Sequence, residues 1–180
     1  MANRAPRALL ARIRLVVLDV DGTMTDGRLY YGAQGEALKA FDVRDGHGLR
    51  LLSIYGGVTL AVLTGRRPDL VEQRCRELSI AHVVGQSRAK GEAIEAISRD
   101  AGIPLSEAAF MGDDVNDLPA LRKVALPCAP ADAAAEVLTE VRWVSRRRAG
   151  RGAVRELCEI LLAAKVGWPP PEEPKPVPQG

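Results

Sequence analysis

Short apolar runs alternate with helix-like stretches along most of this chain. Six runs are rich in aliphatic and β-branched residues and are typical of buried strands; they cover residues 13–20, 58–63, 81–84, 108–111, 125–129 and 142–144. Helical spacing or helix-start signals mark the stretches between and after them, at about 49–55, 69–78, 89–101, 116–124, 131–138 and 153–165. Because strands alternate with helices, we predict an α/β fold built on a doubly wound, Rossmann-like parallel sheet.

One segment departs from this alternation. Residues 29–31 and 37–43 have strand character, and the turn-like stretch 32–35 separates them. We interpret residues about 25–44 as a β-hairpin that projects from the main body. The segment 44–48 then leads into the helix that is expected to begin near residue 49.

The two ends of the chain differ from its middle. A length of 180 residues favours one domain, which we place at residues 12–166. The basic stretch 1–11 has apolar patches too short for a signal peptide and is expected to be a loose leader. Six of the twelve prolines fall within residues 169–178, so residues 167–180 are predicted to be a disordered, proline-rich tail.

Charge, hydropathy and cysteine spacing exclude several classes of function. A net charge of +2 is too small to indicate nucleic-acid binding, and no apolar run reaches the ~18 residues of a membrane span. Cys75, Cys128 and Cys158 are isolated, so neither a zinc knuckle nor a disulfide framework is indicated. Buried, reduced thiols are typical of a cytoplasmic protein, which is the location that we expect.

Polar side chains follow three of the predicted strands at the point where each strand ends. They are Asp19 and Asp21 after the first run, Thr64 after the second, and Asp113 and Asp114 after the fourth, with Lys90 at a helix start between the last two. The carboxyl ends of parallel strands meet at one edge of a sheet, so we expect a single site. Clustered carboxylates bind a hard cation such as Mg²⁺, and a hydroxyl and an ammonium supply what a phosphoryl group needs.

In their order and spacing these residues resemble the haloacid dehalogenase-like (HAD) phosphohydrolases over about residues 13–130. The matching segments are Asp19-Val20-Asp21-Gly22-Thr23, Thr64, Lys90, and Gly112-Asp113-Asp114 with Asn116-Asp117. The resemblance implies a HAD-type sheet and Mg²⁺ as the cofactor. It implies Asp19 as the nucleophile that forms an aspartyl-phosphate and Asp21 as the acid that protonates the leaving alcohol and then activates water.

The resemblance also assigns the remaining groups of the site. It implies that the metal is held by Asp19, Asp113 and the backbone carbonyl of Asp21, with Asp114 in support. It implies that the phosphoryl oxygens are bound by Thr64, Gly65 and Lys90. A carboxylate is a weak nucleophile toward a phosphate dianion because like charges repel, and nearby cations lower that barrier.

The chain has no room for the cap domain that members of this superfamily usually carry. Residues 24–63 separate the first two motifs, and the hairpin fills much of that length. The gap from Lys90 to Asp113 holds one helix and one strand. We therefore expect a capless site that is open to water unless another subunit covers it.

Further segments resemble the 3-deoxy-D-manno-octulosonate 8-phosphate phosphatases over about residues 12–165. They are Thr25-Asp26-Gly27, the hairpin, Lys39-Ala40-Phe41, residues 43–48 and residues 150–156. This resemblance implies a Mg²⁺-dependent homotetramer whose sites are completed by neighbouring chains. The implied substrate is a small phosphorylated sugar acid of eight carbons on the route to lipopolysaccharide. The candidate substrate-binding residues are Arg44, Asp45, His47, Arg66 and Arg151.

Two other functions are compatible with the same body. One is a phosphatase of a nine-carbon, sialic-type acid phosphate. The other is an assembly module related to the C-terminal domains of sialate cytidylyltransferases, which the intact catalytic residues argue against. A signalling receiver domain is excluded, because here the D-x-D motif comes first and Asp113 and Asp114 come late in the chain.

Overall fold

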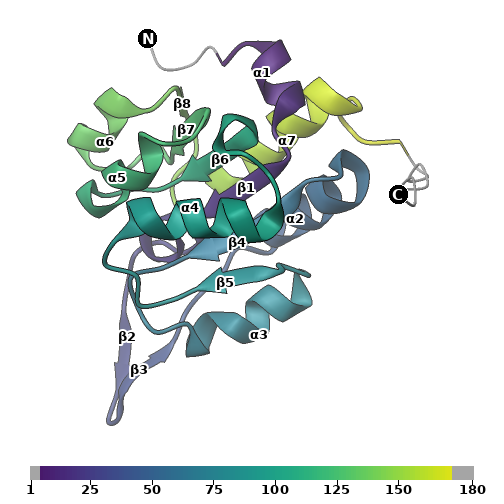
Figure 1. The fold of residues 1–180 in the computed structure, drawn as a ribbon. Helices are drawn as coiled ribbons and strands as arrows, with labels where there is room; N and C mark the ends of the chain where they lie inside the picture. The colour runs from purple at the N-terminus through teal and green to yellow at the C-terminus, as the bar shows by residue number, and fades with distance from the viewer. Residues whose placement is uncertain (1–4, 172–180) are drawn as a thin grey trace.

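A six-stranded, fully parallel sheet forms the centre of the computed structural model, which describes residues 5–171 (Figure 1). Its spatial order is β5-β4-β1-β6-β7-β8. The strands are β1 (Leu15–Leu18), β4 (Thr59–Leu63), β5 (His82–Val84), β6 (Ala108–Met111), β7 (Leu126–Ala129) and β8 (Trp143–Val144). The predicted doubly wound α/β fold is confirmed, and β1 lies in the interior of the sheet with β4 and β6 as neighbours.

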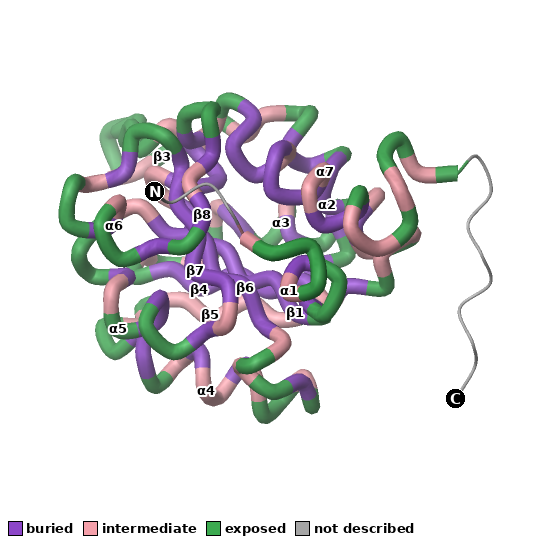
Figure 2. Tube along the Cα trace, turned by 90° about the horizontal axis from the view of Figure 1, so that it is seen from above, coloured by how far each residue is buried: buried purple, intermediate pink, exposed green. Residues whose placement is uncertain are grey.

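Helices cover both faces of the sheet, and the strands between them are buried (Figure 2). One face carries α1 (Arg7–Arg12), α2 (Val43–Gly56), α3 (Asp69–Glu77) and α7 (Ala153–Lys165); the other carries α4 (Lys90–Ala101), α5 (Leu118–Leu121) and α6 (Ala135–Glu140). Alternate residues of β1 point to opposite faces of the sheet. Val16 packs in the hydrophobic core on the first face and Val17 in the core on the other. This explains why the run is apolar throughout.

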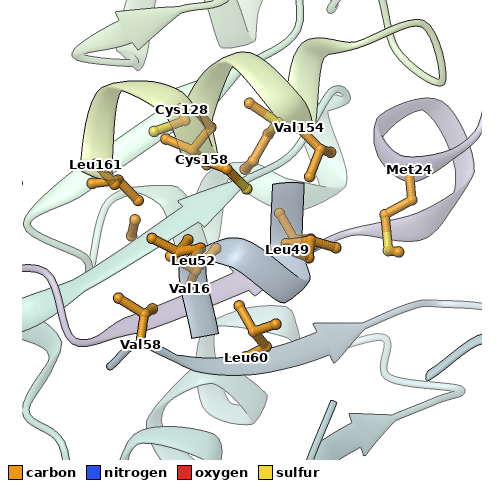
Figure 3. Packing of buried hydrophobic residues seen from close by; sticks show 14 of the residues in the cluster. Val16, Met24, Leu49, Leu52, Val58, Leu60, Cys128, Val154, Cys158 and Leu161 are labelled. Carbon is orange, nitrogen blue, oxygen red and sulfur yellow. The ribbon is translucent and has the colours of Figure 1, made fainter. Parts of the chain in front are cut away.

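The core on the first face is formed largely by α2 and α7 (Figure 3). Leu49 and Leu52 of α2 lie against Val154 and Leu161 of α7, above Val16 of β1. All five side chains are 0% exposed. Burial of each such side chain contributes about 1.5–3 kcal/mol, so this contact fixes the position of both helices on the sheet.

The predicted hairpin is present and extends away from the body of the molecule (Figure 1). Its strands are β2 (Tyr30–Gly32) and β3 (Gly35–Leu38), joined by a two-residue turn. Gly35 has a φ of +109°, which favours glycine at this position. Between β1 and β4 the described chain contains one irregular helical turn, the hairpin and α2, so the expected absence of a cap domain is confirmed for these residues.

The expected loose leader at residues 1–11 is wrong from Arg7 onward, where α1 begins after Pro6. Leu10 is buried in the core and Leu9 is partly buried against it. The helix packs on α7, so apolar contacts order this segment. Residues 1–4 of the leader lie outside the described residues.

The second helix also begins earlier than predicted, at Val43 instead of near Leu49. The Asp42 carboxylate accepts the backbone N–H groups of Arg44 at 2.7 Å and Asp45 at 3.4 Å. An acidic N-cap of this kind satisfies N–H groups that have no partner inside the helix. The segment 44–48 is therefore the start of a helix and not a turn before it.

Other boundaries differ by smaller amounts. The helix expected at 116–124 is a short 3₁₀ turn at Val115–Asp117 followed by α5, and α6 begins at Ala135. Residues 167–171 of the expected tail form no helix or strand, and Trp168 lies 5.0 Å from the Arg155 guanidinium; residues 172–180 lie outside the described part. Among residues 5–171, no helix is both long and apolar enough to cross a membrane.

Candidate active site

The carboxyl ends of four adjacent strands meet at one pocket of about 230 Å³. Asp19 follows β1 directly, Thr64 follows β4, and Asp113 comes shortly after β6. Lys90, after β5, is the first residue of α4. The pocket is lined by Asp19, Asp21, Thr64, Gly65, Arg66, Lys90, Asp113, Asp114 and Asn116. The structure thus brings together the residues that the sequence places at separate strand ends.

Gly22 allows the first and the last of these loops to approach each other. Its φ is +89°, which favours glycine. A Cβ at this position would lie 2.0 Å from Oδ2 of Asp113. The carboxylate of Asp113 therefore occupies the space that any other side chain at position 22 would fill.

Lys90 links two of the acidic side chains. Its Nζ donates to Oδ1 of Asp19 at 2.6 Å and also to Oδ1 of Asp117, and its side chain is 2% exposed. Burial alone would lower the pKa of Lys90, but the two carboxylates outweigh burial and raise it. A fixed ammonium ion in this position suits binding of an anionic phosphoryl group.

Asp117 is part of the site, although the sequence reasoning did not select it as a functional residue. It is fully buried, and its Oδ2 accepts the backbone N–H groups of Asp113 at 2.9 Å and Asp114 at 3.3 Å. The buried side chain of Asp117 thus fixes the backbone of the loop that carries Asp113. The sequence feature that could have identified Asp117 is its position, four residues after Asp113 and within the fourth motif of the resemblance.

Three carboxylates provide a set of oxygens suited to a divalent cation. Asp19, Asp113 and Asp117 each offer an oxygen, and these oxygens lie within 4.8 Å of one another. Burial, followed by the charge of Asp117, raises the pKa of Asp19 to about 7. Burial, followed by the charge of Asp19, raises the pKa of Asp113 to about 8. The donor set fits Mg²⁺, which prefers hard oxygen ligands and would favour the charged carboxylates.

Two further predicted residues, Asp114 of the metal site and Thr64 of the phosphate site, differ in their exposure and in their hydrogen bonds. Asp114 is exposed, and its side chain accepts the N–H of Val115 at 2.7 Å as a helix cap. Thr64 is buried, and its Oγ1 accepts the N–H of Arg66 at 3.1 Å. The Thr64 hydroxyl can still donate its own proton, as phosphate binding requires.

Asp21 lies beside Asp19 at the pocket and contacts the hairpin. Its Oδ1 accepts a hydrogen bond from Nζ of Lys39, a residue that the sequence reasoning did not propose for the site. Lys39 also donates to Oε1 of Glu36 at 2.6 Å. The second carboxylate oxygen of Asp21, Oδ2, is buried and has no hydrogen-bond partner within residues 5–171.

A second pocket of about 760 Å³ adjoins the first and shares Gly65 and Arg66 with it. Arg66 donates to Oε2 of Glu36 at 3.2 Å and to the hydroxyl of Tyr31 at 3.4 Å. Burial alone would raise the pKa of Glu36, but Lys39 and then Arg66 outweigh burial and lower it. The hairpin is therefore tied to the edge of the site by a chain of charged contacts.

Comparisons with known proteins agree with this geometry. Residues 76–157 match the family model of haloacid dehalogenase-like hydrolases. The 3-deoxy-D-manno-octulosonate 8-phosphate phosphatase of Yersinia pestis is 43% identical over 155 residues, which are 86% of this chain and 82% of that protein. The chain belongs to this phosphatase family of HAD-like hydrolases.

Two crystal structures of family members superpose on the chain. The Yersinia pestis enzyme has a TM-score of 0.85 at 41% identity, covering 88% of this chain and 85% of that one. The Moraxella catarrhalis enzyme, in complex with magnesium, phosphate and KDO (3-deoxy-D-manno-octulosonate), also has a TM-score of 0.85. It is 34% identical, with 88% of this chain and 91% of that chain covered.

Four of the predicted substrate-binding residues do not line either pocket of the described chain. Arg44 and His47 are exposed near the start of α2. Arg151 is exposed and lines a separate pocket of about 290 Å³. Asp45 is buried, and its oxygens accept the N–H groups of Gly152 at 3.3 Å and Arg155 at 2.7 Å, so it joins α2 to α7 instead of facing the site. Arg66 is the member of this set that lines both pockets.

Proposed function

We propose that this protein is a Mg²⁺-dependent phosphatase that hydrolyses KDO 8-phosphate to KDO and inorganic phosphate, a step toward lipopolysaccharide. The observation that carries the proposal is the convergence of Asp19, Asp21, Lys90 and Asp113 on one pocket. Family membership supports the substrate, since the Yersinia pestis relative that carries this name is 43% identical.

In the first step, a carboxylate oxygen of Asp19 attacks the phosphorus atom and forms an aspartyl-phosphate. The sugar alcohol leaves as Asp21 donates a proton to its oxygen. Lys90 and the Thr64 hydroxyl hold the phosphoryl oxygens during the attack. Bound Mg²⁺, held by Asp19, Asp113 and the carbonyl of Asp21, supplies charge neutralisation; the burial of Asp117 and its bond to Lys90 suit it to support this set.

In the second step, water hydrolyses the aspartyl-phosphate. Asp21, now a carboxylate, accepts a proton from the water as its oxygen attacks phosphorus. The Asp19–phosphate bond breaks, which releases inorganic phosphate and restores both side chains. The two aspartates thus perform different tasks because only Asp19 is bonded to Lys90 and only Asp21 to the hairpin.

The second pocket gives the sugar acid a place to lie. With the phosphate in the smaller pocket, the rest of the molecule can extend past Gly65 into the space of about 760 Å³. Arg66 at the junction recognises the carboxylate with its planar guanidinium group. A nine-carbon acid phosphate would use the same groups, whereas an assembly module would not need the buried Lys90 and its two carboxylates.

We also propose that four copies assemble through their hairpins in the cytoplasm. The hairpin exposes apolar side chains: Leu29 is 41% exposed, Tyr31 67% and Leu38 52%. Patches of this kind are typical of interaction surfaces. In the assembly a neighbouring chain would close the open site, and Arg151 would reach a neighbour's pocket. The three cysteines are free and buried, as is common in reducing compartments.

The substrate is tested by phosphate release from a panel of sugar-acid and simple sugar phosphates with Mg²⁺. We expect KDO 8-phosphate to have the highest kcat/KM, and preference for the nine-carbon acid phosphate or a simple sugar phosphate would overturn the assignment. Asp19→Asn is expected to abolish turnover while the circular-dichroism spectrum is unchanged. Near-normal activity of that variant would reject the mechanism.

The assembly is tested by sedimentation velocity at micromolar concentration. We expect a tetramer, and the double variant Tyr31→Ser/Leu38→Ser is expected to dissociate with loss of activity. A wild-type monomer with full activity would contradict the proposed assembly without affecting the proposed chemistry.

A further inference from the structure

Lys39 belongs to the exposed hairpin, yet its side chain is only 2% exposed. It follows β3 directly, and its neighbours Leu38 and Ala40 are both exposed. Lysine is normally among the residues that face water, and a buried ammonium is stable only when opposite charge compensates it. Here a charged side chain points inward while an apolar neighbour faces outward, which is the reverse of the usual arrangement.

An irregularity in the hairpin explains how Glu36 and Lys39 come to share a side. Residues three apart on a regular strand point to opposite faces. The pairing shifts register between Tyr30 and Tyr31, so that β3 has one extra residue, Ala37, opposite this point. Such bulges re-aim side chains and are common beside active sites. The outcome is a contact of 2.6 Å between Nζ of Lys39 and Oε1 of Glu36.

The inward-facing ammonium holds one oxygen of the proton-transferring residue and leaves the other free. Nζ of Lys39 donates to Oδ1 of Asp21. Oδ2 of Asp21 is buried and has no hydrogen-bond partner in the described chain, and Asp21 is one of the residues that line the pocket. Glu36 in turn is held by Arg66, whose Nη2 is 3.1 Å from Oε2. The orientation of Asp21 is thus fixed from the hairpin.

We propose that Lys39 is a positioning residue: anchored by Glu36, it orients the Asp21 carboxylate so that Oδ2 transfers the proton in both steps. This inference rests on the proposed function, in which Asp21 protonates the leaving alcohol and then takes a proton from water. It makes the hairpin part of the catalytic machinery of its own chain, in addition to any role in assembly. Lys39 itself lines neither pocket, so its effect on substrate binding is expected to be small.

Lys39→Met keeps the length of the side chain and removes the ammonium group. A misplacement of about 1 Å in a reacting group costs on the order of 10²-fold in rate. We expect kcat for KDO 8-phosphate to fall by about that factor, with KM changed by less than about 3-fold. Lys39→Arg retains a donor and is expected to recover most of the loss.

A substrate with a good leaving group separates the two proton transfers. The phenolate of p-nitrophenyl phosphate needs no proton to leave, so the first step survives in Lys39→Met. The second step still requires Asp21 to activate water. Rapid mixing of the variant with p-nitrophenyl phosphate is therefore expected to show a burst of p-nitrophenol stoichiometric with enzyme, followed by slow turnover.

The matched control is Lys123→Met, which removes an ion pair with Glu95 on the outer surface of α4. This variant is expected to have wild-type activity on both substrates.

Glu36→Gln leaves Lys39 in place without its charged anchor, and we expect a smaller loss of kcat than in Lys39→Met. A rise in KM with unchanged kcat, or no burst and no loss, would overturn the inference. Wild-type protein inactive on both substrates would instead refute the proposed function.

Discussion

The site has more buried negative charge than its own ammonium group balances. Asp19, Asp113 and Asp117 place carboxylate oxygens within 4.8 Å of one another, and Lys90 is bonded to two of the three. Like charges at this range disfavour ionisation. Burial is the main cause of the raised pKa values of Asp19 and Asp113, and the neighbouring carboxylates raise them further. A divalent cation would therefore complete the charge balance of the site.

Replacing Gly22 by alanine tests how closely the loops that carry Asp19 and Asp113 must approach each other. The new Cβ would lie 2.0 Å from Oδ2 of Asp113, so the carboxylate has to move. We expect Gly22→Ala to lower kcat/KM for KDO 8-phosphate by on the order of 10²-fold, measured by phosphate release with saturating Mg²⁺.

Gly57→Ala is the matched control for that substitution. Gly57 also has a positive φ, +60°, but no atom lies within 4 Å of the position of its Cβ. The strain of a left-handed residue costs about 1–2 kcal/mol, so this variant is expected to melt earlier and retain its activity. Equal activity losses in the two variants would show that backbone strain, and not the displaced carboxylate, explains the effect.

Single residues were predictable where the chemistry is local. Asp19, Thr64 and Asp113 each follow an apolar run. Because the carboxyl ends of parallel strands lie at the same edge of a sheet, such residues are expected to lie close together. Lys39 was not predictable in this way, because its contact with Asp21 joins residues 18 apart in the sequence through a bulged hairpin. Its role depends on how the hairpin is placed relative to Asp21, and the local sequence pattern of the hairpin does not specify that placement.

Two helices are joined by one buried carboxylate. Asp45 in the first turn of α2 accepts backbone N–H groups at the start of α7, and it is 4% exposed. These N–H groups have no partner inside their own helix. The contact positions the segment before α7, which contains Arg151, so Asp45 influences that arginine without lining a pocket itself.

This contact predicts a specific pH dependence of stability. Burial raises the pKa of Asp45 from 3.8 to about 6 in the folded chain. Between those values the unfolded chain has lost the proton and the folded chain retains it, so stability falls as pH rises and is level above about 6. A shift of this size corresponds to on the order of 3 kcal/mol.

Asp45→Asn is expected to remove that part of the pH dependence. Urea unfolding of both proteins between pH about 4 and 7 gives the difference in free energy of unfolding, and groups that titrate in both proteins cancel. The difference is expected to change across the window set by the Asp45 pKa. Parallel curves for the two proteins over the whole range would contradict the assignment.

Helix and strand positions were predicted well where the apolar pattern was long. They were predicted less well where the start of a helix depends on an N-cap or on packing against another helix. The sheet strands and α4 lie close to their expected positions. The start of α2 was missed because two glycines, Gly46 and Gly48, obscured its helical pattern, although Asp42 is a good N-cap. The helix at Arg7–Arg12 was missed because its stability comes from packing on α7, which the leader sequence alone does not show.

At the scale of the whole molecule, the sheet brings together groups that are far apart in the sequence. Asp19 directly follows β1, and Asp113 and Asp117 lie in the segment that follows the neighbouring strand β6. Any ligand that binds them links these parts of the fold and stabilises the folded chain, because the unfolded chain cannot present the same oxygens. Metal binding should therefore be visible in the stability of the whole protein, independently of turnover.

Thermal unfolding with and without Mg²⁺ measures this linkage. At a concentration of about 100 times Kd, a ligand adds about 2.7 kcal/mol, which for a chain of this size raises Tm by about 5–10 °C. We expect that increase in Tm on adding MgCl₂ to wild-type protein treated with EDTA. Asp113→Asn loses one of the three oxygen donors and is expected to show a much smaller increase, whereas Asp100→Asn, on the exposed side of α4, should behave as wild type. An equal increase in all three proteins would mean that Mg²⁺ acts elsewhere, and the carboxylates would then need another explanation for their burial.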